Sequence, residues 1–231
     1  APNTSLLIDV GNVLKTSLFY FLFGPSLIAS YYDRLGYDFV HWQILDFVAL
    51  VPNVVEFMQH AGSDVEFVVS NLEGFANDTR SNGTVISAFA IKTFAGQAAG
   101  GGDEKVGFAA TLAENLNSLV AYSQSLNSTE ETDALLVAVA SLQNRGVNKI
   151  VASVSSNATA EKVLAAVPGI DILIVPGQLQ ANAATSMGPV GPYPMVYQTR
   201  WLQDVLVVSS GTFGQLIGVL DVTFDDNGVI A

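Results

Sequence analysis

Short apolar runs alternate with segments of helical spacing along most of the chain. The short runs, rich in Val and Ile, predict strands over residues 5–10, 65–71, 86–92, 149–154 and 170–175. Apolar positions three or four residues apart predict helices over residues 25–35, 52–60, 112–123, 130–144 and 159–166. Strands that alternate with helices are typical of an α/β protein, so we expect that class.

The end of the chain has a different pattern, because two apolar runs flank a turn that contains glycine. Residues 205–208 and 217–224 have strand composition, and Gly211 and Gly214 lie between them. This pattern predicts a hairpin in which the two runs pair as adjacent antiparallel strands.

The composition narrows the classes of function. Half of the 231 residues are apolar and only 13% are charged, against about a quarter in ordinary soluble domains. Nine basic residues and a net charge of −12 leave no basic stripe, which argues against binding to nucleic acid or anionic membranes. The longest apolar run, 18–32, is broken by Gly24 and Pro25 and is too short for a membrane span. Either a partner or glycans cover apolar surface, or neutral loops enclose a large core.

The chain has no cysteine, which excludes disulfides, thiolate metal sites and a cysteine nucleophile. It has five Asn-x-Ser/Thr triplets, where composition alone gives about two. They begin at Asn3, Asn77, Asn82, Asn127 and Asn157. Together they favour a secreted, extracellular glycoprotein with N-linked glycans; the alternative is an Asn-rich chain from a host that does not glycosylate.

Three blocks of the sequence form a recognisable pattern. The first is LIDVGNVLKTS over residues 7–17, the second is residues 35–40 with 54–57 and 70–72, and the third is residues 146–152 with the VPGID of 167–171 and the tail 205–225. Together they resemble the metallophosphoesterase domain of the 5'-nucleotidase family. The first block is similar to the family's strand that ends in Asp-x-Gly-Asp, the second to the block around its Gly-Asn-His-Glu motif, and the third to its last part. The resemblance implies an α/β/β/α sandwich of two mixed β-sheets flanked by helices.

The resemblance also implies a centre of two divalent ions about 3.5–4 Å apart, held by carboxylates and imidazoles. The family's ligand positions fall on Asp9, Asn12, Asp46, Ser155, Gln178 and Gln180. Asn12 replaces a bridging Asp, and a neutral amide oxygen is a poor bridge between two cations. Ile44 and Leu45 replace the metal-binding Asn and the catalytic His. We therefore predict no metal, no cofactor and no catalytic residue, and expect Ile44 and Leu45 to fill the emptied site.

The remaining candidates for chemistry have simpler explanations. His41 and His60 are the only histidines, and we expect structural rather than ligand roles for both. Residues 209–211 lack the Gly-x-Ser-x-Gly pattern of a nucleophile turn, and 97–102 lacks the Gly-Lys-Ser/Thr end of a phosphate loop. The aromatic run 18–23 is expected to plug the former metal cavity or to join a contact with a partner.

Three functions fit these observations. The first is a non-catalytic secreted glycoprotein, not an enzyme, that serves as a structural or interaction subunit of a larger assembly. The second is a metal-dependent phosphoesterase or 5'-nucleotidase completed by a missing segment. The third is a nucleotide- or sugar-binding module without hydrolysis, in which Trp42, Tyr193 or Trp201 stacks on a ring. Bound metal distinguishes the first two.

The resemblance further predicts one domain over residues 1–231, without the family's first strand and its C-terminal nucleotide-binding domain. Without that strand, residues 6–10 would lie at an open sheet edge. We therefore expect a protein partner or self-assembly.

Overall fold

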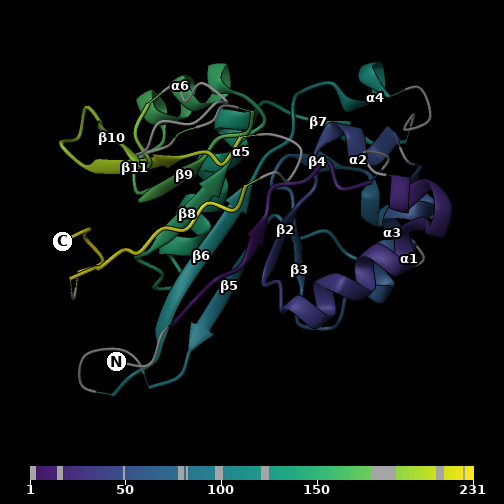
Figure 1. Cartoon of the computed structure of the whole chain (residues 1–231). Coiled ribbons are helices and arrows are strands. Elements are labelled where there is room, and N and C mark those ends of the chain that lie inside the picture. The colour runs from purple at the N-terminus through teal and green to yellow at the C-terminus, as the bar shows by residue number, and fades with distance from the viewer. Residues whose placement is uncertain are drawn as a thin grey trace. The chain divides into compact units, whose positions relative to one another are not determined.

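The computed structural model describes residues 4–14, 18–48, 50–77, 81, 83–96, 101–120, 125–177, 180, 191–211, 216–225 and 227–231 (Figure 1). The chain forms two compact units. Unit 1 consists of residues 1–90 and 110–134, and unit 2 consists of residues 91–109 and 135–231. The predicted α/β class, with sheets flanked by helices, is confirmed.

Unit 1 is built on a parallel sheet of three strands in the order β1-β2-β3. Its strands are β1 (Ile8–Asp9), β2 (Phe39–His41) and β3 (Glu66–Val68), with a separate antiparallel pair of β4 (Leu72–Glu73) and β7 (Asn127–Ser128). Its helices are α1 (Leu18–Leu35), α2 (Ile44–Val48), α3 (Val51–His60), α4 (Leu116–Leu119) and the 3₁₀ turn η1 (Phe75–Asn77).

Three aromatic side chains form the centre of unit 1. The Trp42 ring stacks on Phe67 with centroids 5.5 Å apart and meets Phe57 edge-on at 5.2 Å. Trp42 and Phe57 are completely buried. These rings join α3 to β2 and β3, because Phe57 lies on the apolar face that the spacing of 52–60 predicts.

Helix α1 is longer than predicted and is interrupted at Gly24. Gly24 has φ 73°, outside the helical region, and Pro25 follows it without a backbone N–H. The interruption separates the six residues 18–23 from the predicted helix 25–35.

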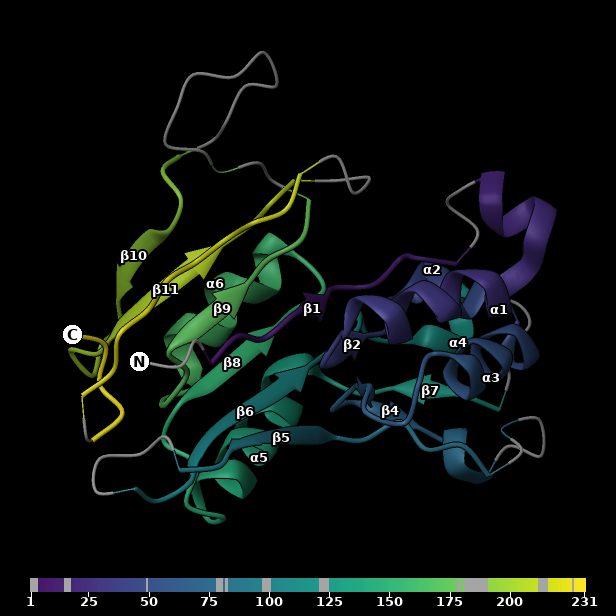
Figure 2. The same cartoon turned by 60° about the horizontal axis from the view of Figure 1, so that its bottom comes forward.

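Unit 2 contains a mixed sheet of six strands in the order β10-β11-β9-β8-β6-β5 (Figure 2). The strands are β5 (Phe89–Phe94), β6 (Glu104–Ala110), β8 (Ile150–Ser153), β9 (Ile172–Ile174), β10 (Met195–Gln198) and β11 (Asp204–Val208). The helices are α5 (Glu131–Gln143) and α6 (Asn157–Ala166). Elements β5, β6 and α5 cross the unit boundary. Helix α5 packs directly on β6, because a Cβ on Gly107 would lie 2.8 Å from the Leu142 side chain.

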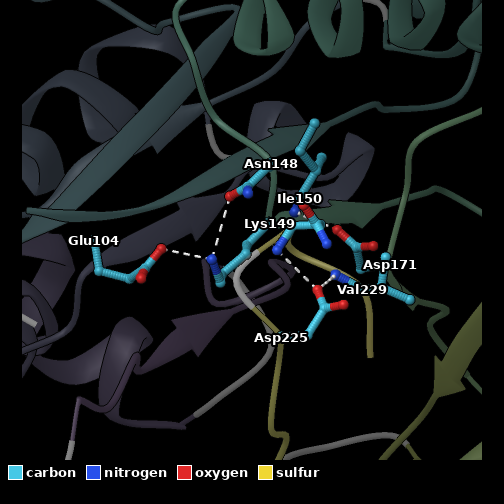
Figure 3. A network of polar contacts seen from close by, with 8 residues as sticks. Glu104, Asn148, Lys149, Ile150, Asp171, Asp225 and Val229 are labelled. Atoms are coloured by element: carbon cyan, nitrogen blue, oxygen red, sulfur yellow. Dashed lines mark hydrogen bonds and ion pairs between the residues drawn. The ribbon is translucent and has the colours of Figure 1, made fainter. Parts of the chain in front are cut away.

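A polar network fixes the last turn of the chain to the start of β8 (Figure 3). The Lys149 ammonium donates to Glu104 at 2.5 Å and lies 5.7 Å from the centre of the Phe224 ring. Asp225 accepts the backbone N–H of Val229 at 2.8 Å, which closes the turn. The turn lies so close to β8 that a Cβ on Gly228 would collide with the Asn148 backbone oxygen.

The structure corrects the predicted hairpin. Strand β11 pairs with β10 in antiparallel fashion and with β9 in parallel fashion, so both of its edges are occupied. Residues 217–223 form no strand, and Phe224 makes an isolated bridge with Ile230 instead. The hairpin partner of β11 is Met195–Gln198, a segment that the sequence analysis did not assign to a strand.

The predicted helix 112–123 is also wrong over most of its length. Among the described residues of this range only Leu116–Leu119 is helical, since Asn115 has φ 62° and the Leu112 N–H is bonded to the Asn71 side chain instead of to a helical carbonyl. Residues 121–124 lie outside the described residues. Among the described residues, no helix is long and apolar enough to cross a membrane.

Replacing Trp42 tests the packing of unit 1. Trp42→Ala removes two ring contacts and leaves a cavity, so we expect the free energy of unfolding to fall by about 3–5 kcal/mol. Trp201→Ala is the matched control; its ring is 39% exposed and stacks on Arg200, and we expect a loss below about 1 kcal/mol. Urea denaturation followed by circular dichroism measures both. Equal losses would contradict a core role for Trp42.

Candidate functional site

Parallel pairing of β1 with β2 brings two site loops to the same end of the sheet. Ile8 is in register with Phe39, and Asp9 is in register with Val40. The loop after β1 contains Asn12, and the loop after β2 leads to Asp46. Three of the predicted site residues therefore lie together in unit 1.

The Asp46 carboxylate binds the backbone of both loops. It is completely buried and accepts the N–H groups of Asn12 at 2.7 Å, Gln43 at 2.9 Å and Leu14 at 3.0 Å. Burial raises the pKa of Asp46 to about 7, and the three N–H donors only partly oppose this rise. Both carboxylate oxygens accept hydrogen bonds from backbone amides of the chain, so Asp46 stabilises the two loops.

The Asp9 carboxylate is also occupied by the chain itself. One oxygen accepts the Gly11 N–H at 2.7 Å, and the other accepts the Tyr32 hydroxyl at 2.8 Å. Burial raises the pKa of Asp9, and burial together with the Asp9 charge raises the pKa of Tyr32. The sequence analysis did not identify Tyr32, because its distance from Asp9 in the sequence gives no local signal.

The loop after β1 fits closely against the loop after β2. Gly11 has φ 87°, and a Cβ there would lie 2.4 Å from the His41 backbone oxygen. Asn12 follows with φ 62° and donates its backbone N–H to Asp46. This tight fit explains why Gly-Asn follows the strand.

His41 is a structural residue, as predicted. Its ring is completely buried, and Nε2 donates to the Thr111 carbonyl oxygen at 2.9 Å. Burial lowers the pKa of His41 to about 3, so the ring is neutral at physiological pH. His60 lies at the exposed end of α3, with Nδ1 2.8 Å from the Glu56 carbonyl oxygen.

Asn71 is a buried polar residue that the sequence analysis placed at a strand end without a role. Its amide nitrogen donates to the carbonyl oxygens of Leu112 at 2.7 Å and Thr129 at 2.8 Å. Its amide oxygen accepts the Leu112 N–H at 3.0 Å. Asn71 thus connects three segments of unit 1 and has the character of a structural residue.

Of the ligand positions in unit 2, Gln180 has a structural role. The buried Gln180 exchanges two bonds with Ser209: its side-chain oxygen accepts the Ser209 N–H at 3.1 Å, and its own N–H donates to the Ser209 carbonyl at 3.2 Å. Ser155 is half-buried in the loop between β8 and α6. Gln178 lies outside the described residues.

The two residues that stand in place of the motif's Asn and His, Ile44 and Leu45, differ in burial. Ile44 is partly buried and packs against the core of unit 1. Leu45 is 50% exposed, so the prediction that it fills the emptied site is wrong. Helix α2 presents Ile44 and Leu45 on different faces because successive helical residues point about 100° apart.

The aromatic run 18–23 does not plug a cavity. Tyr20 is buried and accepts a bond from the Asn53 amide at 2.8 Å. The other five side chains are 55–71% exposed: Leu18, Phe19, Phe21, Leu22 and Phe23. Of the two roles that the sequence analysis left open for this run, contact with a partner remains.

A two-metal centre does not fit these residues. In the part of the chain that the structure describes, no group of three or more His, Asp and Glu side chains is placed to hold a metal ion. Donors of the chain already take three acceptor sites of Asp46 and two of Asp9, all at 3.0 Å or less. These bonds leave each carboxylate fewer sites for a cation than the roughly four of a free carboxylate.

The glycosylation triplets differ in exposure. Asn77 ends η1 and Asn157 begins α6, and both are exposed. Asn127 is half-buried in β7, where it is in register with Glu73. Asn3 and Asn82 lie outside the described residues.

The raised pKa of Asp46 predicts that stability depends on pH. Because the folded pKa is about 7 and the ordinary value is 3.8, the folded state holds this proton more tightly. We expect the free energy of unfolding to be highest near pH 4 and to fall by about 1–4 kcal/mol as pH rises to 7. Chemical denaturation at several pH values measures this slope.

Asp46→Asn separates this group from the others. The Asn side chain has one oxygen where Asp has two, so it cannot accept all three N–H bonds. We therefore expect the free energy of unfolding at pH 5 to fall by about 2–3 kcal/mol and its dependence on pH to become flatter. Asp64→Asn, which removes an exposed carboxylate from the same unit, should keep the parent slope. An unchanged slope in Asp46→Asn would contradict the assignment.

Comparison with curated proteins identifies relatives in one class. The chain is 25% identical to a bovine 5'-nucleotidase over 96% of this chain and 38% of that protein. It is 24% identical to a snake venom 5'-nucleotidase of Gloydius brevicauda, over 96% and 37% of the two chains. The chain therefore spans about two fifths of the length of these relatives. No protein-family model matches the chain.

Comparison with solved structures gives the same fold. A 5'-nucleotidase precursor from Thermus thermophilus superposes with a TM-score of 0.86 at 23% identity, over 100% of this chain and 44% of that one. A calcineurin-like phosphoesterase from Bacillus subtilis superposes with a TM-score of 0.59 at 15% identity, over 89% and 67% of the two chains. The chain is a homologue of the 5'-nucleotidases with a metallophosphoesterase-like fold, and it has a degenerate metal-binding motif set.

Proposed function

We propose that this chain is a non-catalytic, secreted glycoprotein that serves as a structural or interaction subunit of a larger assembly. It uses the metallophosphoesterase-like fold as a scaffold, and we propose that residues 1–231 act as one domain of this kind. The proposal covers the chain's lack of catalysis, its location and its association, and each rests on a separate observation.

The bonding of Asp46 carries the first part of the proposal. This carboxylate stands at the acidic position of the family's Gly-Asn-His-Glu motif, yet it accepts three backbone N–H groups within 3.0 Å. Asp9 is likewise bonded through both oxygens. An ionised carboxylate has about four acceptor sites, and donors of the chain take three of them on Asp46 and two on Asp9, which supports a loop-stabilising role for both.

Two observations support secretion and glycosylation. Five Asn-x-Ser/Thr triplets occur, and the two triplets at Asn77 and Asn157 begin with exposed asparagines. Among the similar proteins, one is a venom protein and another is a precursor form. N-linked glycans add hydration to a surface that has few charged side chains.

The exposed face of residues 18–23 supports association with a partner. Its five exposed side chains leave roughly 500–800 Å² of apolar surface, if a large side chain contributes about 150–250 Å² when fully exposed. No charged residue occurs from Thr16 to Tyr32. An uncharged apolar patch of this size is typical of a contact surface.

Metal content and hydrolysis test the lack of catalysis. We expect the native protein, incubated with Zn²⁺ or Mn²⁺ and dialysed, to retain far less than one metal ion per chain. We also expect no turnover of bis(p-nitrophenyl) phosphate above the rate in buffer, since no metal-activated water is available. Bovine 5'-nucleotidase with a nucleoside 5'-monophosphate is the positive control, and the same monophosphate is offered to this chain as a second substrate. Two ions per chain, or hydrolysis that a chelator abolishes, would refute the proposal.

Glycan mapping tests secretion with position-specific detail. We expect N-linked glycans at the exposed Asn77 and Asn157 and lower occupancy at Asn127, whose backbone is paired in β7. Peptide N-glycosidase in ¹⁸O water labels each occupied asparagine for mass spectrometry of the native protein. Unlabelled Asn77 and Asn157 would contradict the proposal.

A further inference from the structure

Strand β10 lies at the edge of the six-stranded sheet. Met195–Gln198 pairs with β11 on one side, and β10 ends the strand order (Figures 1 and 2). No described residue pairs with its other side. Its outer row of backbone groups is therefore open to a further strand.

The pairing of β10 with β11 fixes which backbone groups face outward. Thr199 donates to the Gln203 carbonyl at 2.9 Å, so Tyr197 and Met195, two and four residues earlier, also face β11. The other side of β11 agrees, because the Leu206 N–H, opposite Val196, points away to the Asp171 carbonyl. The N–H and C=O groups of Val196 and Gln198 therefore point away from β11, toward the open edge of the sheet.

The side chains of β10 do not protect this edge. Natural edge strands are commonly blocked by charged residues, by bulges or by covering segments. Here Met195, Val196 and Tyr197 are 41–64% exposed, and no charged residue occurs from residue 172 to Thr199. Trp201 and Leu202, in the turn after β10, add further exposed apolar surface. The edge combines unpaired backbone groups with apolar side chains.

We propose that β10 pairs in antiparallel fashion with β10 of a second copy of this chain, about a twofold axis at Tyr197. In this register Val196 faces Gln198 of the partner subunit and Gln198 faces Val196 of the partner subunit. All outward groups of both strands then form four hydrogen bonds. A register centred on Val196 would place Gln198 opposite the partner's Pro194, which has no N–H. A register centred on Gln198 would need Arg200, which lies beyond the strand.

A second copy suits this edge because the strand is complementary to itself and uncharged. Each chain has a net charge of −12, so close approach is opposed except where charge is absent, as it is along β10. The contact joins two six-stranded sheets into one continuous sheet, an isologous arrangement. This inference deepens the proposed assembly role by naming one partner. The tests of this dimer do not depend on the outcome of the metal assay.

A cysteine scan tests the register, because the chain has no cysteine of its own. Opposite residues in a non-hydrogen-bonded antiparallel pair have Cα atoms about 4.5 Å apart, within the range of a disulfide. We expect Tyr197→Cys to form a covalent dimer under mild oxidation. Val196→Cys is the matched control, since its own copy lies diagonally across at roughly 7–8 Å and should cross-link far less. Equal or absent cross-linking at both positions would overturn the register.

A proline substitution tests the hydrogen bonds. Val196→Pro removes an outward N–H and leaves the bonds between β10 and β11 intact, as proline tolerates an outward-facing edge position. We expect light scattering to give a dimer of twice 24.4 kDa for the bare parent chain and a dissociation constant raised about 10–100-fold in Val196→Pro. Val196→Ala, which keeps the N–H, should dimerise more strongly than Val196→Pro. A parent that stays monomeric, or a dimer that Val196→Pro leaves unchanged, would overturn the proposal.

Discussion

The architecture around the former metal centre depends on one buried carboxylate and the three amides that it accepts. Asp46 draws the loop after β1 and the loop after β2 together at the ends of two paired strands. A buried carboxylate without partners would cost several kcal/mol, so these bonds are needed for the loops to close as they do. Gly11 lies in the same loop contact, where a Cβ would be only 2.4 Å from the His41 backbone oxygen. In an ancestral two-metal centre, the ions would supply that compensation; here the backbone does.

The side chains next to Asp46 are mostly uncharged. His41 is held uncharged by burial, and Asn12 places a neutral amide where the resemblance implies a bridging Asp. Burial raises the pKa of Asp46 to about 7 and also raises the pKa of Asp9, so both carboxylates depend on the hydrogen bonds of the chain for their stabilisation. These bonds support the structural role that we propose for the two residues.

Local periodicity allowed the sequence to predict the elements whose partners are close in the chain. Helices α3, α5 and α6 and strands β8 and β9 lie within a few residues of their predicted ranges. The failures involve distant contacts. The N–H of the non-helical Leu112 is bonded to Asn71, which lies 41 residues away. The hairpin partner of β11 has no strand pattern that stands out from its Pro- and Gly-rich surroundings. The loss of ligands was visible in the motif positions, whereas Tyr32 and the amide partners of Asp46 were not, because only folding brings them together.

The proposed lack of metal and the proposed association have a common physical basis in this chain. An enzyme must keep its site open to solvent and substrate, which limits how far the loops around it can close or become apolar. Once Asp9 and Asp46 bond to the chain itself, that limit no longer applies to the adjacent segment 18–23, and five large apolar side chains there face outward. Exposed apolar surface of this kind is typical of interaction sites, because covering it removes apolar area from water. The same constraint acts on β10, where neither charge nor a described segment blocks the sheet edge. The chain thus has two uncharged apolar surfaces, residues 18–23 in unit 1 and β10 in unit 2, and both are physically suited to assembly. The hydrogen bonds of Asp9 and Asp46 stabilise the loops of unit 1, which contains the first of these surfaces.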